Sequence, residues 1–242
     1  MSVWKPKRFW KAVTTEAVTT EVSGGGFIVK LDARPAKTPG KALLVVPTAA
    51  LAQAIAAEWD AQHGLVRPET MPFTRAANSA IEKVAPQFAE VVGLLAAYGE
   101  TDLLCYRATE PPELIARQNA AWDPLLDWCA RHLQAPLTAT AGVMHIPQPP
   151  ASTARLHAMT AAMTPFQTAA FHDLVMLSGS LVLAFAVTDR RLTPAEAWTI
   201  SRIDETYQIE QWGEDEDAAA LAEIKRAAFH QAATFWALCS PD

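Results

Sequence analysis

Six histidines are the residues best suited to metal binding or proton transfer in this chain of 242 residues. They are His63, His132, His145, His157, His172 and His230. No two of them have the i, i+3 or i, i+4 spacing that would direct both rings toward one ion from a helix. His172 stands beside Asp173, but adjacent residues of a helix point to different faces. We therefore expect surface or hydrogen-bonded histidines and no metal site.

Two segments of small residues resemble functional loops in composition only. Gly24-Gly25-Gly26 leads from one predicted strand into another, so it lacks the helix N-terminus that binds a phosphate, and we expect a hairpin turn. Ser178-Gly179-Ser180 has no base nearby in sequence to activate a serine, and it lies within the apolar stretch 174–187. We expect that stretch to be one buried core helix. Because nucleotide-binding, hydrolase and zinc-protease motifs are missing, we expect no catalytic residues and no cofactor.

Acidic residues gather near the end of the chain. Between residues 204 and 217 there are seven acids and no Lys or Arg: Asp204, Glu205, Glu210, Glu214, Asp215, Glu216 and Asp217. Without them, 19 acids would face 20 bases, so this segment accounts for the net charge of −6. The overall balance argues against a broad nucleic-acid footprint, which needs clustered cations.

The acidic segment includes a helical pattern with two distinct stripes. On a helix predicted to begin at Pro194, Ile200, Ile203 and Tyr207 share one face, which suits a core. Glu205, Gln208 and Trp212 share another, and this mixture of carboxylate, amide and indole is typical of a docking surface. Solvent exposure alone explains that stripe about as well. Residues 214–217 are better explained as a polar loop at the N-terminus of the last helix.

Composition indicates a globular chain. Half of the residues are hydrophobic and 19% are charged, so the surface is expected to be more neutral than usual. Cys105, Cys129 and Cys239 lie far apart without metal-ligand spacing, which favours reduced thiols in a cytosol-like compartment. The longest apolar stretch is too short to cross a bilayer, and we expect no stable membrane insertion.

The chain changes from strand-like to helical patterns once. Short strands are predicted over 9–13, 17–22, 27–31 and 43–46. Thr48 then caps a helix that ends at Gly64, in which Trp59 shares a face with Leu51 and Ile55 and should anchor the helix to the sheet. Further helices are predicted over 74–83, 86–98, 112–122, 123–133 and 217–239, and after the capping boxes at Thr164 and Thr193. We predict an α+β fold with a small β-rich N-terminal domain, residues 1–75, and a larger all-helical C-terminal domain, residues 76–242.

Several blocks of this sequence resemble a known family. The most extensive are Lys7-Arg8-Phe9-Trp10-Lys11, Leu31-Asp32-Ala33-Arg34-Pro35, Thr101-Asp102-Leu103-Leu104-Cys105-Tyr106 and Ser201-Arg202-Ile203-Asp204-Glu205-Thr206-Tyr207-Gln208. In this order they resemble the assembly chaperones of mitochondria and alphaproteobacteria that hold the alpha subunit of the ATP synthase catalytic head. Trp10 departs from the family, in which many members carry tyrosine there.

The resemblance implies a non-enzymatic chaperone. It would bind the unassembled alpha subunit of the F-type ATP synthase and prevent its aggregation until it meets the beta subunit. An acidic residue in the block around Glu205 is important in the family, which makes Glu205 the first candidate and Glu210 the second, with Gln208 and Trp212 beside them. Mitochondrial members carry a transit peptide ahead of the first block, so this chain is expected to be a bacterial, cytoplasmic member, and a monomer when free.

Two other functions stay open from the sequence. The chain could be an enzyme or small-molecule-binding protein that uses an interdomain cleft, with Asp204 or Glu205 as acid or base. It could also be a permanent structural subunit of a complex. A deep pocket with convergent titratable groups would favour the enzyme, and an exposed apolar patch would favour the chaperone.

Overall fold

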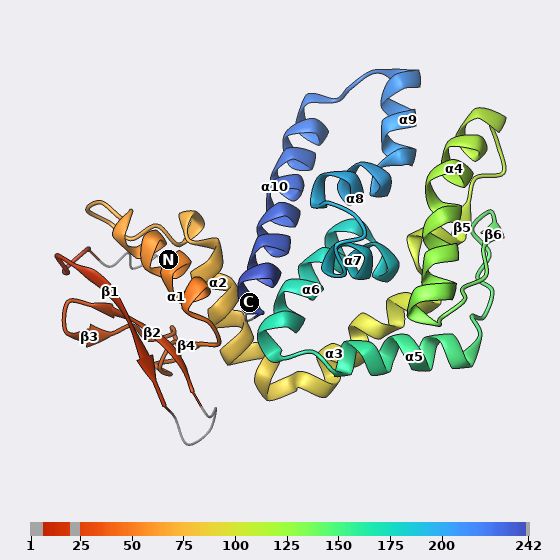
Figure 1. Cartoon of the computed structure of the whole chain (residues 1–242). Helices are drawn as coiled ribbons and strands as arrows, with labels where there is room; N and C mark the ends of the chain where they lie inside the picture. Colours follow the sequence, from red (N-terminus) through yellow and green to blue (C-terminus); the bar gives the residue numbers. More distant parts are fainter. Residues whose placement is uncertain (1–6, 20–24, 241–242) are drawn as a thin grey trace. The chain divides into compact units, whose positions relative to one another are not determined.

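A computed structural model describes residues 7–19 and 25–240 of the chain. The chain falls into two compact units. The N-terminal unit comprises Met1–Phe88, Thr164–Ala170 and Thr234–Asp242, and the C-terminal unit comprises Ala89–Met163 and Phe171–Ala233. An antiparallel sheet followed by a largely helical remainder confirms the predicted α+β fold (Figure 1). The predicted domain boundary between residues 75 and 76 stays a prediction, which limited proteolysis would test.

The sheet of the N-terminal unit is built around β2 (Gly26–Leu31). β1 (Val13–Val18) pairs with the whole length of β2, and β3 (Arg34–Pro35) and β4 (Val45–Val46) pair with its two ends, all antiparallel. This topology leaves β1 at the edge of the sheet.

The predicted separate strand over residues 9–13 is wrong. The backbone N–H groups of Lys11 and Ala12 donate to the carboxylate of Asp32, at 3.0 and 2.9 Å, instead of to a neighbouring strand. Trp10 is buried against Trp59, with the two ring centres 5.2 Å apart. The predicted strand 17–22 and the predicted turn 24–26 fall partly on residues 20–24, which lie outside the described residues.

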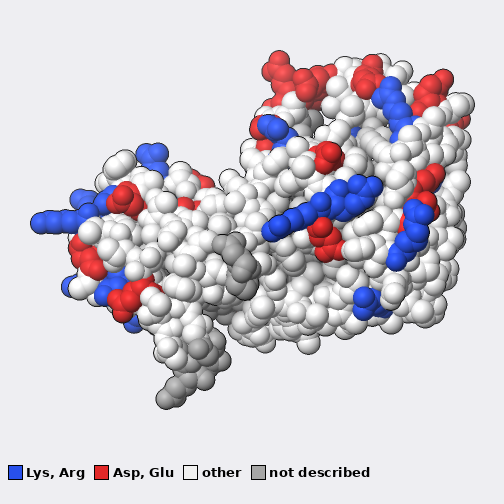
Figure 2. All heavy atoms as spheres, in the orientation of Figure 1, with Lys and Arg blue, Asp and Glu red and all other residues white. Residues whose placement is uncertain are grey.

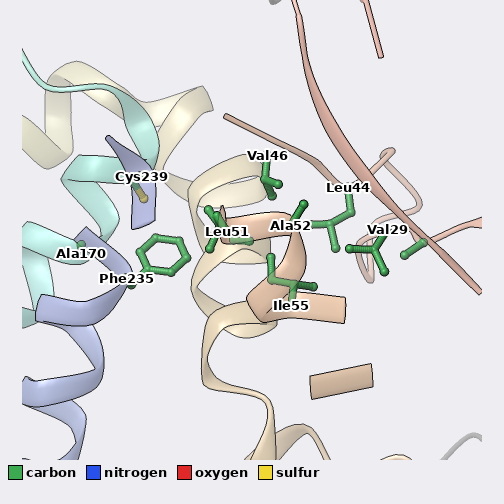
Figure 3. Close-up of a cluster of buried hydrophobic side chains, with 11 residues drawn as sticks. Val29, Leu44, Val46, Leu51, Ala52, Ile55, Ala170, Phe235 and Cys239 are labelled. Carbon is green, nitrogen blue, oxygen red and sulfur yellow. The ribbon is translucent and has the colours of Figure 1, made fainter. Parts of the chain in front are cut away.

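Helix α1 (Ala49–Asp60) covers the sheet and begins at the predicted cap, but it ends at Asp60 and does not extend to Gly64. The hydroxyl of Thr48 accepts a hydrogen bond from the backbone N–H of Leu51 at 3.1 Å. Leu51 and Ile55 are fully buried in the core of this unit, together with Phe235 from the last helix (Figure 3). The core therefore joins segments from both ends of the chain.

The carboxylate of Glu58 connects α1 to α2 (Pro72–Ser79). It accepts hydrogen bonds from the backbone N–H groups of Phe73 and Thr74, at 2.7 and 2.8 Å, which are unpaired donors of the first turn of α2. After α2 the helix continues through a wide turn, 80–84, before α3 (Phe88–Ala96).

In the C-terminal unit, α4 (Pro112–Trp128) runs through a position where a break was predicted. The predicted helices 112–122 and 123–133 are one helix, continued by a wide turn to Leu133, and Pro124 lies inside it. Proline removes one helical hydrogen bond. However, Trp122 and Leu125 are buried on either side of the proline, and their packing keeps the helix continuous. A short parallel pair, β5 (Tyr106–Arg107) and β6 (Thr140–Ala141), and helix α5 (Pro150–Ala161) complete this region.

The apolar stretch 174–187 forms two helices rather than one, so the predicted single core helix is wrong. Helix α6 (Pro165–Ser178) ends at Gly179, whose φ of +72° lies in the region that favours glycine. Helix α7 (Leu181–Thr188) then begins, with the hydroxyl of Ser180 as its cap. The predicted burial is confirmed for α7, in which every residue except Thr188 is buried, but Met176 of α6 is 49% exposed.

Both predicted capping boxes are present. Thr164 and Gln167 exchange hydrogen bonds of 2.9 and 3.2 Å at the start of α6, and Thr193 and Glu196 exchange bonds of 2.8 and 3.2 Å at the start of α8 (Pro194–Ser201). The helix predicted from Pro194 does not continue to Trp212, because it breaks at Arg202 and resumes as α9 (Ile203–Trp212). Helix α10 (Glu216–Cys239) closes the chain as predicted. None of the helices formed by the described residues is long and apolar enough to traverse a bilayer.

Candidate docking groove

Helices α9 and α10 border a groove of about 510 Å³ within the C-terminal unit. Glu205, Gln208 and Trp212 line it from α9, and Ala218, Ala222 and Arg226 line it from α10. The alanines leave room between the helices because their side chains end at Cβ. Three of the four residues predicted to bind a partner therefore face one concave surface.

Contacts with α4 fix the orientation of α9. The amide of Gln118 donates to the carboxylate of Asp204 at 2.6 Å, and the guanidinium of Arg117 donates to Glu210 at 2.6 Å. The same guanidinium lies 5.3 Å from the ring centre of Tyr207. Because one face of α9 is held against α4, the stripe that begins at Glu205 is directed into the groove.

Glu210 belongs to the α4 contact and does not line the groove. The predicted core stripe also differs from expectation, since Ile203 and Tyr207 are half-buried and no residue of α9 is fully buried. The break at Arg202 changes the direction of the chain, so α9 does not continue the buried face of α8. Helix α9 is consequently a surface helix.

Two ion pairs stand in the groove. Arg202 lies 2.8 Å from Glu205, and Arg226 lies 2.8 Å from Glu223. The hydrogen bond from Arg226 lowers the pKa of Glu223, and the same contact raises the pKa of Arg226. These pairs orient two carboxylates at the groove surface.

The remaining charge of the groove is negative. Its charged lining residues are four acids and two arginines, and both arginines already have acidic partners. Glu214 and Asp215 make no ion pair with another described residue, which leaves a net charge of −2 from the lining. Figure 2 shows carboxylates gathered over the connection between α9 and α10. The groove would therefore favour a partner segment that carries cations.

Large apolar side chains are exposed beside these charges. The indole of Trp212 is 79% exposed, and Ile209 of the groove is also exposed. On α10, Leu221 and Ile224 are exposed as well, but neither of them lines the groove. A group of exposed apolar residues bordered by charge is typical of a protein-binding surface.

Groove residues that were missed from the sequence include Arg202, Ala222, Glu223 and Arg226. Glu223 and Arg226 have the i, i+3 spacing of a helical ion pair, and that spacing was the available signal. Nothing in the sequence placed α10 beside α9.

The other reactive side chains form no second constellation in the described chain. Within residues 7–19 and 25–240, His, Cys, Asp and Glu nowhere gather in the groups of three that could hold a metal ion. His172 and Asp173 do contact each other, with Nδ1 and a carboxylate oxygen 3.0 Å apart, although adjacent helical residues were expected to diverge. Burial raises the pKa of the Cys105, Cys129 and Cys239 thiols to about 12, so they are unreactive at neutral pH.

The chain is similar to proteins of one chaperone family. Residues 7–130 match the model of the ATP12 chaperone protein. The crystal structure of Atp12 from Paracoccus denitrificans is 49% identical, with a TM-score of 0.92 over 97% of this chain and 98% of that one. An aspartate-to-lysine mutant of that protein is 48% identical, with the same TM-score and coverage. The mitochondrial protein atp12 of Schizosaccharomyces pombe is 26% identical over 224 residues, 88% of this chain and 75% of the relative. This chain belongs to the ATP12 family of non-enzymatic chaperones for ATP synthase assembly.

Proposed function

We propose that this protein binds the unassembled alpha subunit of the F-type ATP synthase catalytic head and prevents its aggregation until it meets the beta subunit. The groove between α9 and α10 is the proposed client-binding site, with Glu205, Gln208 and Trp212 as its contact residues. The observation that carries this proposal is an exposed apolar group bordered by acids, on a chain of a chaperone family.

The physical basis of this proposal is the surface that an unassembled subunit exposes. Obligate interfaces are large and apolar, so a subunit without its partner exposes surface that favours aggregation. Trp212 and Ile209 would cover part of that surface, and they are already exposed in the free chaperone. The unpaired carboxylates of Glu214 and Asp215 would attract cationic side chains of the client and so determine how the client is positioned in the groove.

Glu205 and Glu210 have different roles in this proposal. Glu205 lines the groove, and its partner Arg202 belongs to the same surface. Glu210 is engaged by Arg117 of α4, so its contribution would be to hold α9 in place. Replacing Glu205 by lysine would set two cations side by side in the groove and repel a cationic client segment.

The direct test is suppression of aggregation. Denatured alpha subunit from the same organism is diluted into buffer with a stoichiometric amount of chaperone, and light scattering is recorded. Wild-type protein should suppress the scattering, and Glu205→Lys should suppress it markedly less. Glu113→Lys is the matched control, because Glu113 is an exposed acid of α4 outside the groove. Unchanged aggregation with the wild-type protein would refute the proposed function.

The proposal includes a free monomer that works in the bacterial cytoplasm. The Paracoccus relative supports a bacterial setting, and the fission-yeast relative is mitochondrial. Cell fractionation and light scattering coupled to gel filtration would test both points. Release of the protein from finished ATP synthase would distinguish a chaperone from a permanent subunit.

A further inference from the structure

The N-terminal unit carries a second groove that the proposed client site does not use. It measures about 560 Å³ and is walled by Phe9, Trp10, Trp59 and Val66. Of the two neighbouring aromatic residues, Trp10 is only 3% exposed, whereas Phe9 is 60% exposed. Their rings meet edge to face, with centres 5.1 Å apart. An apolar concavity with an exposed ring at its border suits an apolar side chain of a ligand.

The charged side chains that line this groove are both cations. Arg34 and Lys37 form no ion pair with another described residue, whereas Arg8 pairs with Asp60 at 3.1 Å and Lys30 pairs with Glu16 at 2.8 Å. The guanidinium of Arg34 lies 6.0 Å from the ring centre of Phe9, so charge and apolar surface are adjacent. These two cations are therefore available to the carboxylates of a ligand.

Asp32, the acid nearest in sequence to Arg34 and Lys37, forms no ion pair with either of them among the described residues. The carboxylate of Asp32 accepts hydrogen bonds from the backbone N–H groups of Lys11 and Ala12. Residues 1–88 contain eleven Lys and Arg against seven Asp and Glu, a net charge of +4. The charge around this groove is thus opposite to that of the groove between α9 and α10.

The groove wall also contains unused hydrogen-bond donors. The indole nitrogens of Trp10 and Trp59 are buried and have no hydrogen-bond partner among the described residues. The unpaired cations Arg34 and Lys37 favour an anionic ligand.

We propose that this second groove binds an extended segment of the client in which an apolar side chain is flanked by carboxylates. The apolar side chain occupies the aromatic concavity, and the flanking carboxylates pair with Arg34 and Lys37. The identity of the client rests on the proposed function, whereas the ligand chemistry rests on the groove alone. Two grooves of opposite charge would bind different segments of one client, which raises affinity through effective concentration.

The first experiment measures the ligand chemistry without the client. Fluorescence anisotropy follows a labelled peptide, Gly-Glu-Asp-Phe-Asp-Glu-Gly, and a second peptide in which lysine replaces every acid. The acidic peptide should bind the wild-type protein, and Arg34→Glu/Lys37→Glu should weaken this binding about tenfold or more. Phe9→Ala should weaken it as well. Lys41→Glu/Lys83→Glu, which changes the charge of the same unit equally outside the groove, should bind as the wild type does.

Several outcomes of this experiment would overturn the proposal. They are equal binding of the lysine peptide, an equal loss in the control variant, and tighter binding of an oligothymidylate, which would assign the groove to nucleic acid. Sedimentation would detect binding to a second copy of this chain, in which Trp212 is followed closely by four acids in sequence. If the wild-type protein is a dimer and Arg34→Glu/Lys37→Glu is a monomer, the groove binds that second copy.

The second experiment uses the alpha subunit and separates the two proposals. Arg34→Glu/Lys37→Glu should weaken client binding about fivefold or more. This loss is expected although Glu205 in the first groove is unchanged. Unchanged client affinity in this variant would overturn the assignment of the groove to the client. If the wild-type protein binds the acidic peptide but not the alpha subunit, the proposed function fails and the ligand chemistry of the groove stands.

Discussion

The buried carboxylate of Asp102 accepts a hydrogen bond from the hydroxyl of Ser180, 78 residues further along the chain, at 2.8 Å. It also accepts from the backbone N–H groups of Leu104 and Val182, each at 3.0 Å. One side chain thereby fixes the start of α7 and the turn at residue 102. Burial raises the pKa of this carboxyl, so its three donors offset part of the desolvation of its charge.

We predict that Asp102→Ala lowers the free energy of unfolding by about 3 kcal/mol or more, because each buried donor left without an acceptor costs about 1–3 kcal/mol. Urea denaturation measures this change. Asp127→Ala removes an exposed carboxylate of α4 and should change the stability by at most about 0.5 kcal/mol. A loss below about 1 kcal/mol for Asp102→Ala would show that water or a rearranged turn replaces the carboxylate.

The three thiols should not react with a disulfide reagent in the folded protein at pH 8, because burial raises their pKa to about 12. Their ordinary value is 9.0, so between pH 9.0 and about 12 the unfolded chain releases protons that the folded chain retains. The free energy of unfolding should therefore fall as the pH rises through this window. Titration with Ellman's reagent, before and after denaturation, measures the reactivity. Rapid labelling of the native protein would contradict the burial of Cys105, Cys129 and Cys239.

Trp59 and Trp212 should differ in their contribution to stability. Trp59 packs on Trp10 and on the core of α1, so Trp59→Ala should lower the stability by about 3 kcal/mol. Trp212 is exposed, so Trp212→Ala should leave the thermal midpoint within about 2 °C of the wild type and weaken suppression of client aggregation. Differential scanning fluorimetry and the scattering assay measure the two effects. A destabilised Trp212→Ala protein would indicate a structural indole.

Client binding should weaken as the salt concentration rises, because the free carboxylates of the α9–α10 groove are exposed to solvent. Glu214→Gln/Asp215→Asn removes two charges and should reduce this salt dependence. The Asp215→Asn change preserves the cap of α10, because a side-chain amide oxygen takes the place of the carboxylate oxygen that accepts from the N–H of Ala218 at 2.8 Å. Glu90→Gln/Glu113→Gln is the control with equal charge in the same unit. An equal salt dependence in both variants would exclude a specific role for Glu214 and Asp215.

Local signals in the sequence determined much of the fold. Capping boxes at Thr164 and Thr193 and the cap at Thr48 placed three helix starts correctly, because the donors and acceptors of a cap lie within three residues of one another. The stripe of Glu205, Gln208 and Trp212 also follows from helical spacing alone. The family resemblance was confirmed by the comparisons.

Contacts between residues far apart in sequence determined the features of the fold that these local signals could not predict. The burial of Asp102 beside Ser180 accompanies the break in the apolar stretch, and the packing of Trp122 and Leu125 keeps α4 intact through Pro124. The ion pair with Arg117, 93 residues away in sequence, assigns Glu210 to the contact with α4. Each of these outcomes depends on a residue tens of positions away, and local periodicity carries no information about such partners.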